Sequence, residues 1–264
     1  MRRLMLLLAA LLATSPASAA EMRLLAAELP PFTYHVPPPT VSEIGEAHGL
    51  VYELVRAMAK RTGHSGTIEF MGWSRAQELA IIGPNVGILA LTRSPEREPF
   101  YNWMVNIVTD DLILVGSAGV DAASLDRVKD RPTGVLRTSG AENLLRELKF
   151  TRIEPASEEW VNALKLRERR IDAWLAPRLM VLYGWREIGG DASALNIGQI
   201  VRPSPIYFAA SRDVPETEAD RWREAFAQVR ADGTYDRILS YYRRLKAEPI
   251  PEERRRFDRI EWGY

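Results

Sequence analysis

Apolar residues recur along the chain with two alternating periods, one typical of strands and one typical of helices. In the segment 49–63, for example, Leu50, Leu54 and Met58 share one helical face, and Gly63 supplies a stop. Strands are expected at 23–29, 66–71 and 86–91, and helices at 49–63 and 74–82, the latter with Ser74 as its cap. The order β-α-β-α-β predicts a parallel sheet covered by helices.

The same alternation restarts after residue 110. Strands are expected at 111–116, 133–137, 151–156, 170–176 and 205–213, and helices at 139–149, 157–169, 177–185 and 216–246, the last broken at Asp232-Gly233. No Gly/Ser linker separates the two α/β units, so the chain is expected to cross between them through strands. A cleft between two such lobes is a common place for a small-molecule site.

The first twenty residues have the pattern of a secretory signal peptide. Arg2 and Arg3 form a basic start, residues 4–12 are apolar, and Ala17-Ser18-Ala19 is a small-residue cleavage motif. The apolar run is too short to span a bilayer, although an uncleaved anchor is the alternative. The chain has no cysteine, which excludes a lipoprotein anchored through an N-terminal Cys. We therefore expect an exported protein cleaved near Ala19 or Ala20.

Composition excludes several classes of function. Without Arg2 and Arg3 the chain has 33 basic and 35 acidic residues, a formal charge of −2, which gives no footprint for nucleic acid or an anionic membrane. The absence of cysteine rules out disulfides and thiolate metal sites. His35, His48 and His64 lie in or beside loops without metal-ligand spacing, and neither a G-x-S-x-G elbow nor a phosphate-binding glycine loop occurs. The sequence predicts no metal, no cofactor and no catalytic residue.

Two segments instead indicate anion binding. Ser139 and Glu142 form an S-x-x-E capping box at a helix start, where the free amides of Gly140 and Ala141 add to the helix dipole. Arg97 follows the buried strand at 86–91, where loops at the carboxyl edge of an α/β sheet face the ligand crevice. Each feature also has a plainer interpretation, namely ordinary helix capping and a surface ion pair.

Six segments make the chain similar to a known family. They are LPPFTY (29–34), HGLVYELVRAMAKRTG (48–63), VGILALTRSPERE (86–98), PTGVLRTSGAENL (132–144), RRIDAWLA (169–176) and FAQVRADGTYDRILSYY (226–242). Over residues 23–242 the chain resembles the family 3 extracellular solute-binding proteins, the polar amino-acid-binding type that serves ABC transporters. The T-x-x-x-x-R spacing from Thr92 to Arg97 and the R-A-D-G-T-Y stretch are the most specific parts of the resemblance.

The resemblance implies a two-lobed α/β fold of the periplasmic-binding-protein type (type II) with two hinge strands and a ligand cleft between the lobes. The first lobe would take residues 21–108 and 206–264, and the second would take 109–205. The two lobes would then close on the ligand by rotating about the hinge strands. The same resemblance implies a periplasmic location.

The resemblance also implies which residues hold the ligand. Arg97 would grip the ligand carboxylate. Thr92 and the carbonyl of Ala90 would contact the carboxylate or the α-amine, and Ser139 and Gly140 would complete the grip from the second lobe. Opposed donors from both lobes would favour the closed state.

One departure from the family concerns the ligand's amine. An aspartate often follows the R-I-D-A strand and pairs with the ammonium group, whereas this chain has Pro177 and Arg178 there. Burying an unpaired ammonium is costly. Either another acid such as Glu28 takes the role, or the ligand is an anion without an amine. We also count Tyr34 and Arg178 among the expected ligand-binding residues.

The segment 72–76 resembles a subgroup of the family that carries W-x-R-A. Trp73 would wall the cleft and Arg75 would add a second cation; alternatively, Trp73 packs beneath its helix and Arg75 is solvated. Together the resemblances imply a monomeric, non-enzymatic protein that captures a small carboxylate-bearing ligand for an inner-membrane ABC permease. The alternatives are a sensory or accessory binding protein without a transporter, and a periplasmic dehydratase on the same scaffold, which would need an acid in the cleft.

Overall fold

The computed structural model describes residues 21–36 and 46–245. The predicted signal peptide and its cleavage site lie outside these residues, as does the C-terminal part of the predicted first lobe beyond residue 245. Among the residues described, none of the helices has both the length and the apolar character needed to cross a membrane.

A mixed sheet runs through the whole described molecule. In the described chain it has eight strands in the order β4-β1-β5-β10-β6-β9-β7-β8. The strands are β1 (Arg23–Ala26), β4 (Ile68–Phe70), β5 (Val86–Thr92), β6 (Asn102–Gly116), β7 (Thr133–Leu136), β8 (Ile153–Ala156), β9 (Ala173–Pro177) and β10 (Asn196–Ala210). A separate two-stranded pair joins β2 (Tyr34–His35) to β3 (Ala47–His48). Parallel strands lie at both ends of the large sheet, and the long antiparallel pair β6–β10 connects them.

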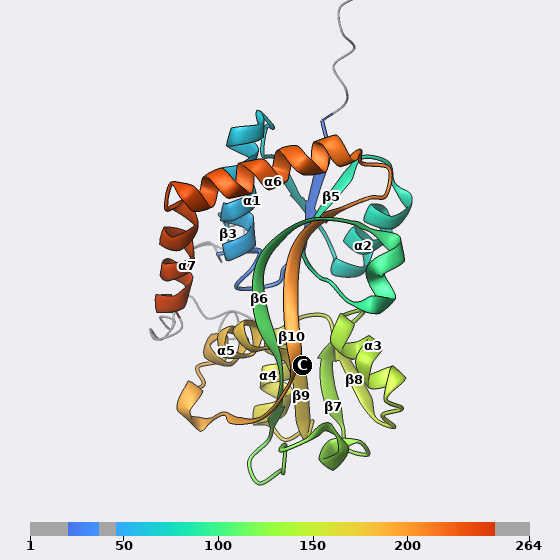
Figure 1. Cartoon of the computed structure of the whole chain (residues 1–264). Coiled ribbons are helices and arrows are strands. Elements are labelled where there is room, and N and C mark those ends of the chain that lie inside the picture. Colours follow the sequence, from blue (N-terminus) through green and yellow to red (C-terminus); the bar gives the residue numbers. More distant parts are fainter. Residues whose placement is uncertain (1–20, 37–45, 246–264) are drawn as a thin grey trace, which may run out of the picture.

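Helices cover both faces of each end of the sheet and so define two lobes (Figure 1). In the first lobe, α1 (Leu50–Thr62), α6 (Glu216–Ala231) and α7 (Thr234–Leu245) cover one face, and α2 (Trp73–Ile82) covers the other. In the second lobe, α4 (Glu159–Arg167) and α5 (Arg178–Glu187) cover one face, and α3 (Gly140–Glu147) covers the other. Short 3₁₀ segments lie at η1 (Pro95–Phe100), η2 (Leu125–Val128) and η3 (Ala192–Ala194). The predicted two-lobed α/β fold is confirmed.

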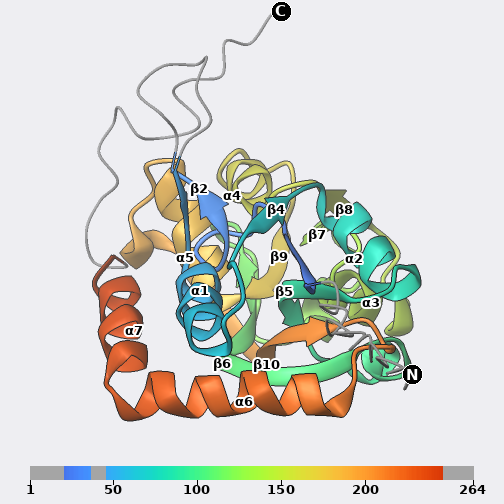
Figure 2. The same ribbon diagram turned by 90° about the horizontal axis from the view of Figure 1, so that it is seen from above.

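The strands β6 and β10 are far longer than their apolar patterns predict. Each has 15 residues, and both pass from one lobe to the other (Figure 1), while α6 packs on the first-lobe end of β6 (Figure 2). The middle section of β6 carries polar residues such as Thr109 and Asp110, where the chain passes from one lobe to the other. The predicted lobe boundaries, 108/109 and 205/206, lie opposite one another here, since Val108 pairs with Ile206 and Thr109 with Pro205. The crossing is therefore a two-stranded ribbon.

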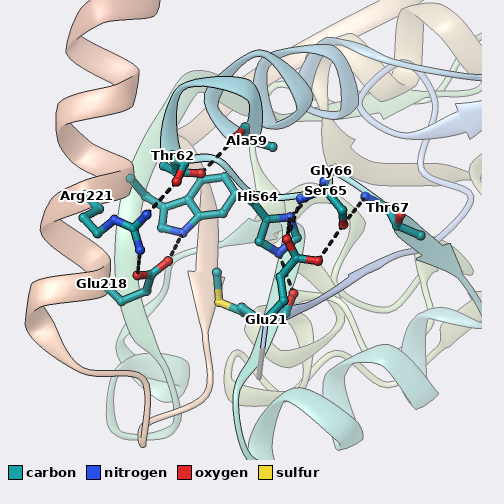
Figure 3. A network of polar contacts seen from close by, with 11 residues as sticks. Glu21, Ala59, Thr62, His64, Ser65, Gly66, Thr67, Glu218 and Arg221 are labelled. Carbon is teal, nitrogen blue, oxygen red and sulfur yellow. Dashed lines mark hydrogen bonds and ion pairs between the residues drawn. The ribbon is translucent and has the colours of Figure 1, made fainter. Parts of the chain in front are cut away.

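A polar network fastens the end of α1 to the segment that precedes β1 (Figure 3). Glu21 accepts hydrogen bonds from the amide and the hydroxyl of Ser65, at 2.5 and 2.6 Å. His64 accepts from the Gly66 amide through Nδ1 and donates from Nε2 to the carbonyl of Met22, which fixes the ring as the Nε2–H tautomer. These contacts hold the start of β1 against the first lobe.

Gly49 marks a close approach of two backbone segments at the start of α1. Its φ of 135° is accessible to glycine alone, and a Cβ there would lie 2.2 Å from the carbonyl oxygen of Phe32. Phe32 lines the cavity described below, so this approach positions a cavity wall.

We expect Gly49→Ala to lower the free energy of unfolding by about 3 kcal/mol or more, because the strained backbone adds to a clash with main-chain atoms. Gly63→Ala is the matched control, because Gly63 also has a positive φ of 79° but has nothing within 4 Å of an added Cβ. It should cost only about 1–2 kcal/mol. Urea unfolding of both variants measures the difference, and equal costs would contradict the close approach.

Candidate ligand-binding cavity

A cavity lies where the two lobes and the crossing strands meet. The empty space between its walls measures about 630 Å³, part of it open to solvent. Its apolar walls are formed by residues of both lobes and both crossing strands, namely Leu29, Phe32, Leu112, Leu136, Met180 and Ile206. A few polar groups converge among these apolar walls, which is the usual composition of a small-molecule site.

Arg97 is the central polar group of the cavity. Its side chain is only 6% exposed, and it lies in η1, directly after β5. Nη1 donates to the carbonyl of Thr92 at 3.1 Å, and Nη2 donates to Gln77 Oε1 at 2.8 Å and to the carbonyl of Thr138 at 2.9 Å. Burial lowers the pKa of Arg97, because desolvation disfavours its charged form.

No carboxylate of the described residues forms an ion pair with Arg97. All three of its hydrogen-bond acceptors are neutral oxygens, and they use three of its five N–H groups. The indole of Trp73 lies 6.0 Å from the guanidinium carbon and supplies a cation–π contact. Arg97 is thus a buried, hydrogen-bonded cation without an ion pair among the described residues, although Glu96 is near enough to interact with its charge.

The N-terminus of α3 faces the same cavity from the second lobe. Ser139 caps the helix by accepting a hydrogen bond from the Glu142 amide at 3.2 Å, as predicted. Glu142 reaches back to the amide of Thr138 at 2.6 Å, one residue before the position of a standard capping box. Gly140 and Ala141 are buried in the first turn and line the cavity. Arg97 Nη1 lies 3.8 Å from the point where a Gly140 Cβ would be, so a guanidinium and the positive end of a helix dipole adjoin.

Ala90 contributes backbone with an unusual conformation. Its φ of 59° is left-handed, and the β5–β10 ladder shifts register between the pairs Tyr207–Leu91 and Ala209–Ile88, which flank it. A bulge of this kind turns backbone groups away from the ladder. Ala90 and Thr92 both line the cavity.

Thr138 forms the contact between the lobes beside Arg97. Besides the bond from Arg97, it receives bonds from Gln77 Nε2 at 3.1 and 3.3 Å and contacts Ser74 Oγ at 3.1 Å. The prediction that Ser74 caps α2 is wrong, because the helix begins one residue earlier, at Trp73, and has no side-chain cap. A hydroxyl placed in the first turn can reach the other lobe instead.

Six residues predicted from the sequence meet at this cavity: Trp73, Ala90, Thr92, Arg97, Ser139 and Gly140. Four others lie elsewhere. Glu28 contacts His35 Nδ1 at 2.5 Å, and Tyr34 packs on Tyr183 with ring centroids 5.4 Å apart. Arg75 is exposed and pairs with Glu78 at 2.7 Å. Arg178 pairs with Asp111 at 3.4 Å. These four are not among the residues that line the cavity.

Sequence reasoning missed two arginines of the cavity. Arg93 is held by Glu98 at 2.5 and 2.9 Å and stacks between Trp103 and Tyr207, with its guanidinium carbon 5.5 and 5.4 Å from the ring centroids. These contacts explain the polar-aromatic run after β5. Arg202 reaches the cavity from β10, which begins nine residues before the strand predicted at 205–213.

Glu159 is the third missed residue and the only carboxyl among the lining residues of the described chain. It is 5% exposed and lies in the first turn of α4. Its Oε2 accepts hydrogen bonds from Asn162 at 2.9 Å and from the indole of Trp174 at 2.8 Å. Burial raises the pKa of Glu159 to about 7, against the opposing effect of these two donors. In the sequence it resembles an ordinary acidic residue at a helix start, and nothing there marks it.

Within residues 21–36 and 46–245, no group of three or more His, Asp or Glu side chains is arranged to hold a metal ion. The polar groups that line the cavity include three arginines, helix amides and one buried carboxyl, set among apolar walls.

Solved structures show the fold to which this arrangement corresponds. No family model matches the sequence, and no curated protein matches it either. A substrate-binding protein of an ABC uptake transporter from Streptococcus pneumoniae, with bound histidine, has a TM-score of 0.73 at 14% identity and covers 88% of this chain and 94% of its own. An ancestral arginine-binding protein bound to arginine has a TM-score of 0.70 at 20% identity, covering 84% and 97%.

A histidine kinase sensor domain with similarity to periplasmic binding proteins has a TM-score of 0.72 at 17% identity, covering 84% of this chain and 96% of that chain. At these identities the likeness establishes the fold. This chain has the two-lobed periplasmic-binding-protein-like fold, and its structural neighbours are amino-acid-binding proteins.

The raised pKa of Glu159 predicts a pH-dependent stability. Because its pKa is about 7 in the folded state and near 4.5 in an unfolded chain, the folded state holds the proton more tightly and stability falls as pH rises between these values. We expect Glu159→Gln to abolish a pH-dependent loss on the order of 3 kcal/mol. Urea unfolding near pH 5 and near pH 8 measures it. Glu154→Gln, at a half-exposed carboxyl on β8, is the control and should leave the pH dependence intact.

Proposed function

We propose that this protein is a periplasmic solute-binding protein that captures a small carboxylate-bearing ligand, an amino acid or a related organic anion, by hinged closure for an ABC-type importer. The observation that carries the proposal is the buried Arg97 cation, which forms no ion pair with a described carboxylate and adjoins the N-terminus of α3. Neighbours that bind arginine, glutamate and histidine support the ligand class.

Electrostatics favours an anion at this position. Removing a cation from water without a counter-charge is costly, and a ligand carboxylate offsets that cost through charge-assisted hydrogen bonds. Two N–H groups of Arg97 remain after its three described contacts, and the amides of Gly140 and Ala141 supply further donors from the opposite lobe. A carboxylate between them contacts both lobes at once, which favours closure.

Export, the permease and the monomeric state belong to the same proposal and rest on the signal-peptide pattern and the resemblance. A sensory role is the second candidate, favoured by the likeness to a histidine kinase sensor domain. The two roles use the same cavity and differ in the docking partner. Pull-down of the exported protein with its co-encoded membrane proteins distinguishes them, because a permease would indicate transport and a sensor kinase would indicate signalling.

A dehydratase on this scaffold would need an acid in the cleft, and Glu159 is such a group. We propose binding without chemistry, because Glu159 already accepts two hydrogen bonds that fix it against the core of the second lobe. Native mass spectrometry of protein purified without denaturation identifies the ligand that it carries. Prolonged incubation with that ligand, followed by mass analysis, should return it unchanged; loss of water from it would establish an enzyme.

Arg97→Ala should weaken binding of the tightest ligand in a panel of standard L-amino acids and short organic acids by at least about tenfold, and by up to several hundredfold. A bidentate charge-assisted contact contributes roughly 1.5–3 kcal/mol, and about 1.4 kcal/mol corresponds to tenfold. Arg97→Lys should recover only part of the affinity, because a point charge cannot replace the planar fork. Isothermal titration calorimetry gives the affinities.

The control for this experiment is Arg170→Ala, at an exposed arginine that pairs with Glu168 at 3.0 Å and lies outside the lining of the cavity. It should bind like the wild type. Because Arg97 is buried and contacts both lobes, the thermal stability of each variant is measured first. Unchanged affinity in a folded Arg97→Ala protein would contradict the proposed carboxylate site.

Ligand binding should also compact the protein. If closure about β6 and β10 accompanies binding, small-angle X-ray scattering will show a smaller radius of gyration with the ligand than without it. Thr138→Ala removes the hydroxyl that meets Ser74 and Gln77 across the lobes and should weaken the closed state without touching the ligand. Confirmed binding with no change in the radius of gyration would contradict the hinged mechanism.

A further inference from the structure

The second lobe lacks an acid at the position where the family resemblance predicts one. Pro177, at the end of β9, lines the cavity, and Arg178 beside it pairs with Asp111 on β6. Glu28, the substitute considered from the sequence, lies outside the lining and contacts His35. A ligand that carries an ammonium group would therefore need a counter-charge from elsewhere in the cavity.

Helix α4 supplies a carboxyl to the same cavity. Glu159 lies in the first turn of α4, which packs on α5 and on the strands β7 and β9, and it lines the cavity together with Pro177, Met180 and Leu136. One carboxylate oxygen, Oε2, accepts both of its described hydrogen bonds, from Asn162 and Trp174. The carboxyl is thereby oriented by groups that are themselves fully buried.

We infer that Glu159 is the recognition group for a cationic nitrogen of the ligand, so that the protein binds an amino acid whose carboxylate lies at Arg97. The inference rests on the proposed function, because it assigns the second charge of the ligand in the same cavity. In this arrangement the Arg97 guanidinium and the amides of α3 bind the ligand carboxylate, and the carboxylate of α4 binds the cationic nitrogen from another part of the cavity wall.

Several charged or titratable groups lie on the elements around Glu159, but none of them causes its raised pKa. The strands β7 and β9 carry no charged or titratable side chain. Helix α4 carries Lys165, which lies 3.9 Å from Glu154 of β8, and Arg167 at its end. The remaining groups are Arg178, Tyr183, Arg186 and Glu187 on α5, and Arg93, Arg97 and Arg202 in the lining of the cavity. None of these is a cause of the raised pKa, which burial produces. A ligand cation would therefore be the group that favours the carboxylate over the neutral acid.

A purely structural role for Glu159 predicts different results, and Glu159→Gln separates the two. The side-chain oxygen of glutamine can still accept from Asn162 and Trp174, so the local packing is retained while the charge is lost. Glu187→Gln is the matched control, because Glu187 is a carboxyl of the same lobe that is 4% exposed and lies outside the lining.

The experiment measures affinity by calorimetry for the standard L-amino acids, their α-hydroxy-acid counterparts and short dicarboxylic acids, with wild type, Glu159→Gln and Glu187→Gln. We expect the tightest ligand to carry a cationic nitrogen. Glu159→Gln should weaken it at least about tenfold, and Glu187→Gln should not, because an ion pair is lost in the first variant alone.

The wild-type protein provides a second measurement that does not depend on the variant folding. Below about pH 7 the cationic ligand must displace a proton from Glu159, so its affinity should rise with pH up to that point and one proton should be released on binding. Calorimetry in buffers of different ionisation enthalpy counts that proton.

Two outcomes overturn the inference and leave the proposed function standing. One is a tightest ligand without a cationic nitrogen, and the other is a cationic ligand whose affinity is unaffected by Glu159→Gln and by pH. Binding of none of the acids by the wild type would instead overturn the proposed function itself.

Discussion

Arg97 brings a guanidinium charge to a position where its side chain is almost completely covered, and the structure around it compensates the loss of water. Three neutral oxygens from Thr92, Gln77 and Thr138 accept its hydrogen bonds. Two of them belong to the first lobe and one belongs to the second. The same side chain therefore links the lobes and presents to the cavity a charge that no ion pair holds, which explains why ligand binding and lobe closure would be coupled.

The long ribbon of β6 and β10 makes this arrangement workable. Hydrophobic clusters lie on both faces of the sheet in each lobe, and the largest one also includes Leu136 and Met180 of the second lobe. The ribbon itself carries polar residues such as Thr109 and Asp110 in its middle section. Asp110 and Asp111, in the middle of β6, receive the Leu179 amide and Arg178, so the start of α5 is tied to the ribbon.

The two buried charged groups of the cavity have complementary requirements. Arg97 is a buried cation that an anion would stabilise, whereas burial raises the pKa of Glu159 to about 7, so that a nearby cation would favour its carboxylate form. A zwitterion meets both requirements at once, while a simple anion meets only the first. Selectivity would thus arise from two desolvated groups on opposite lobes and from the apolar walls between them.

The sequence by itself determined the elements with a clear period and the groups that follow them directly. Periodicity is a local property, and it predicts the helices α1, α6 and α7 and the strand β5 without reference to distant residues. The ends of predicted strands and helices likewise place four residues of the cavity, namely Thr92, Arg97, Ser139 and Gly140. The restart of the α/β alternation also predicted two lobes, and the resemblance to a family added the hinge and the ligand-binding roles.

Strand pairing, ion-pair partners and burial have no local sequence signal, and only the tertiary structure determined them. The polar middle of β6 and β10 pairs only because the two segments lie side by side, which also brings Arg202 to the cavity. Whether Arg75 or Arg178 reaches the ligand depends on their partners Glu78 and Asp111. An acidic residue at the start of a helix is common in sequences and does not indicate a site. Glu159 is a buried carboxyl at the cavity because α4 packs against α5 and Trp174. Its burial depends on residues distant in the chain, and local sequence patterns do not show which residues these are.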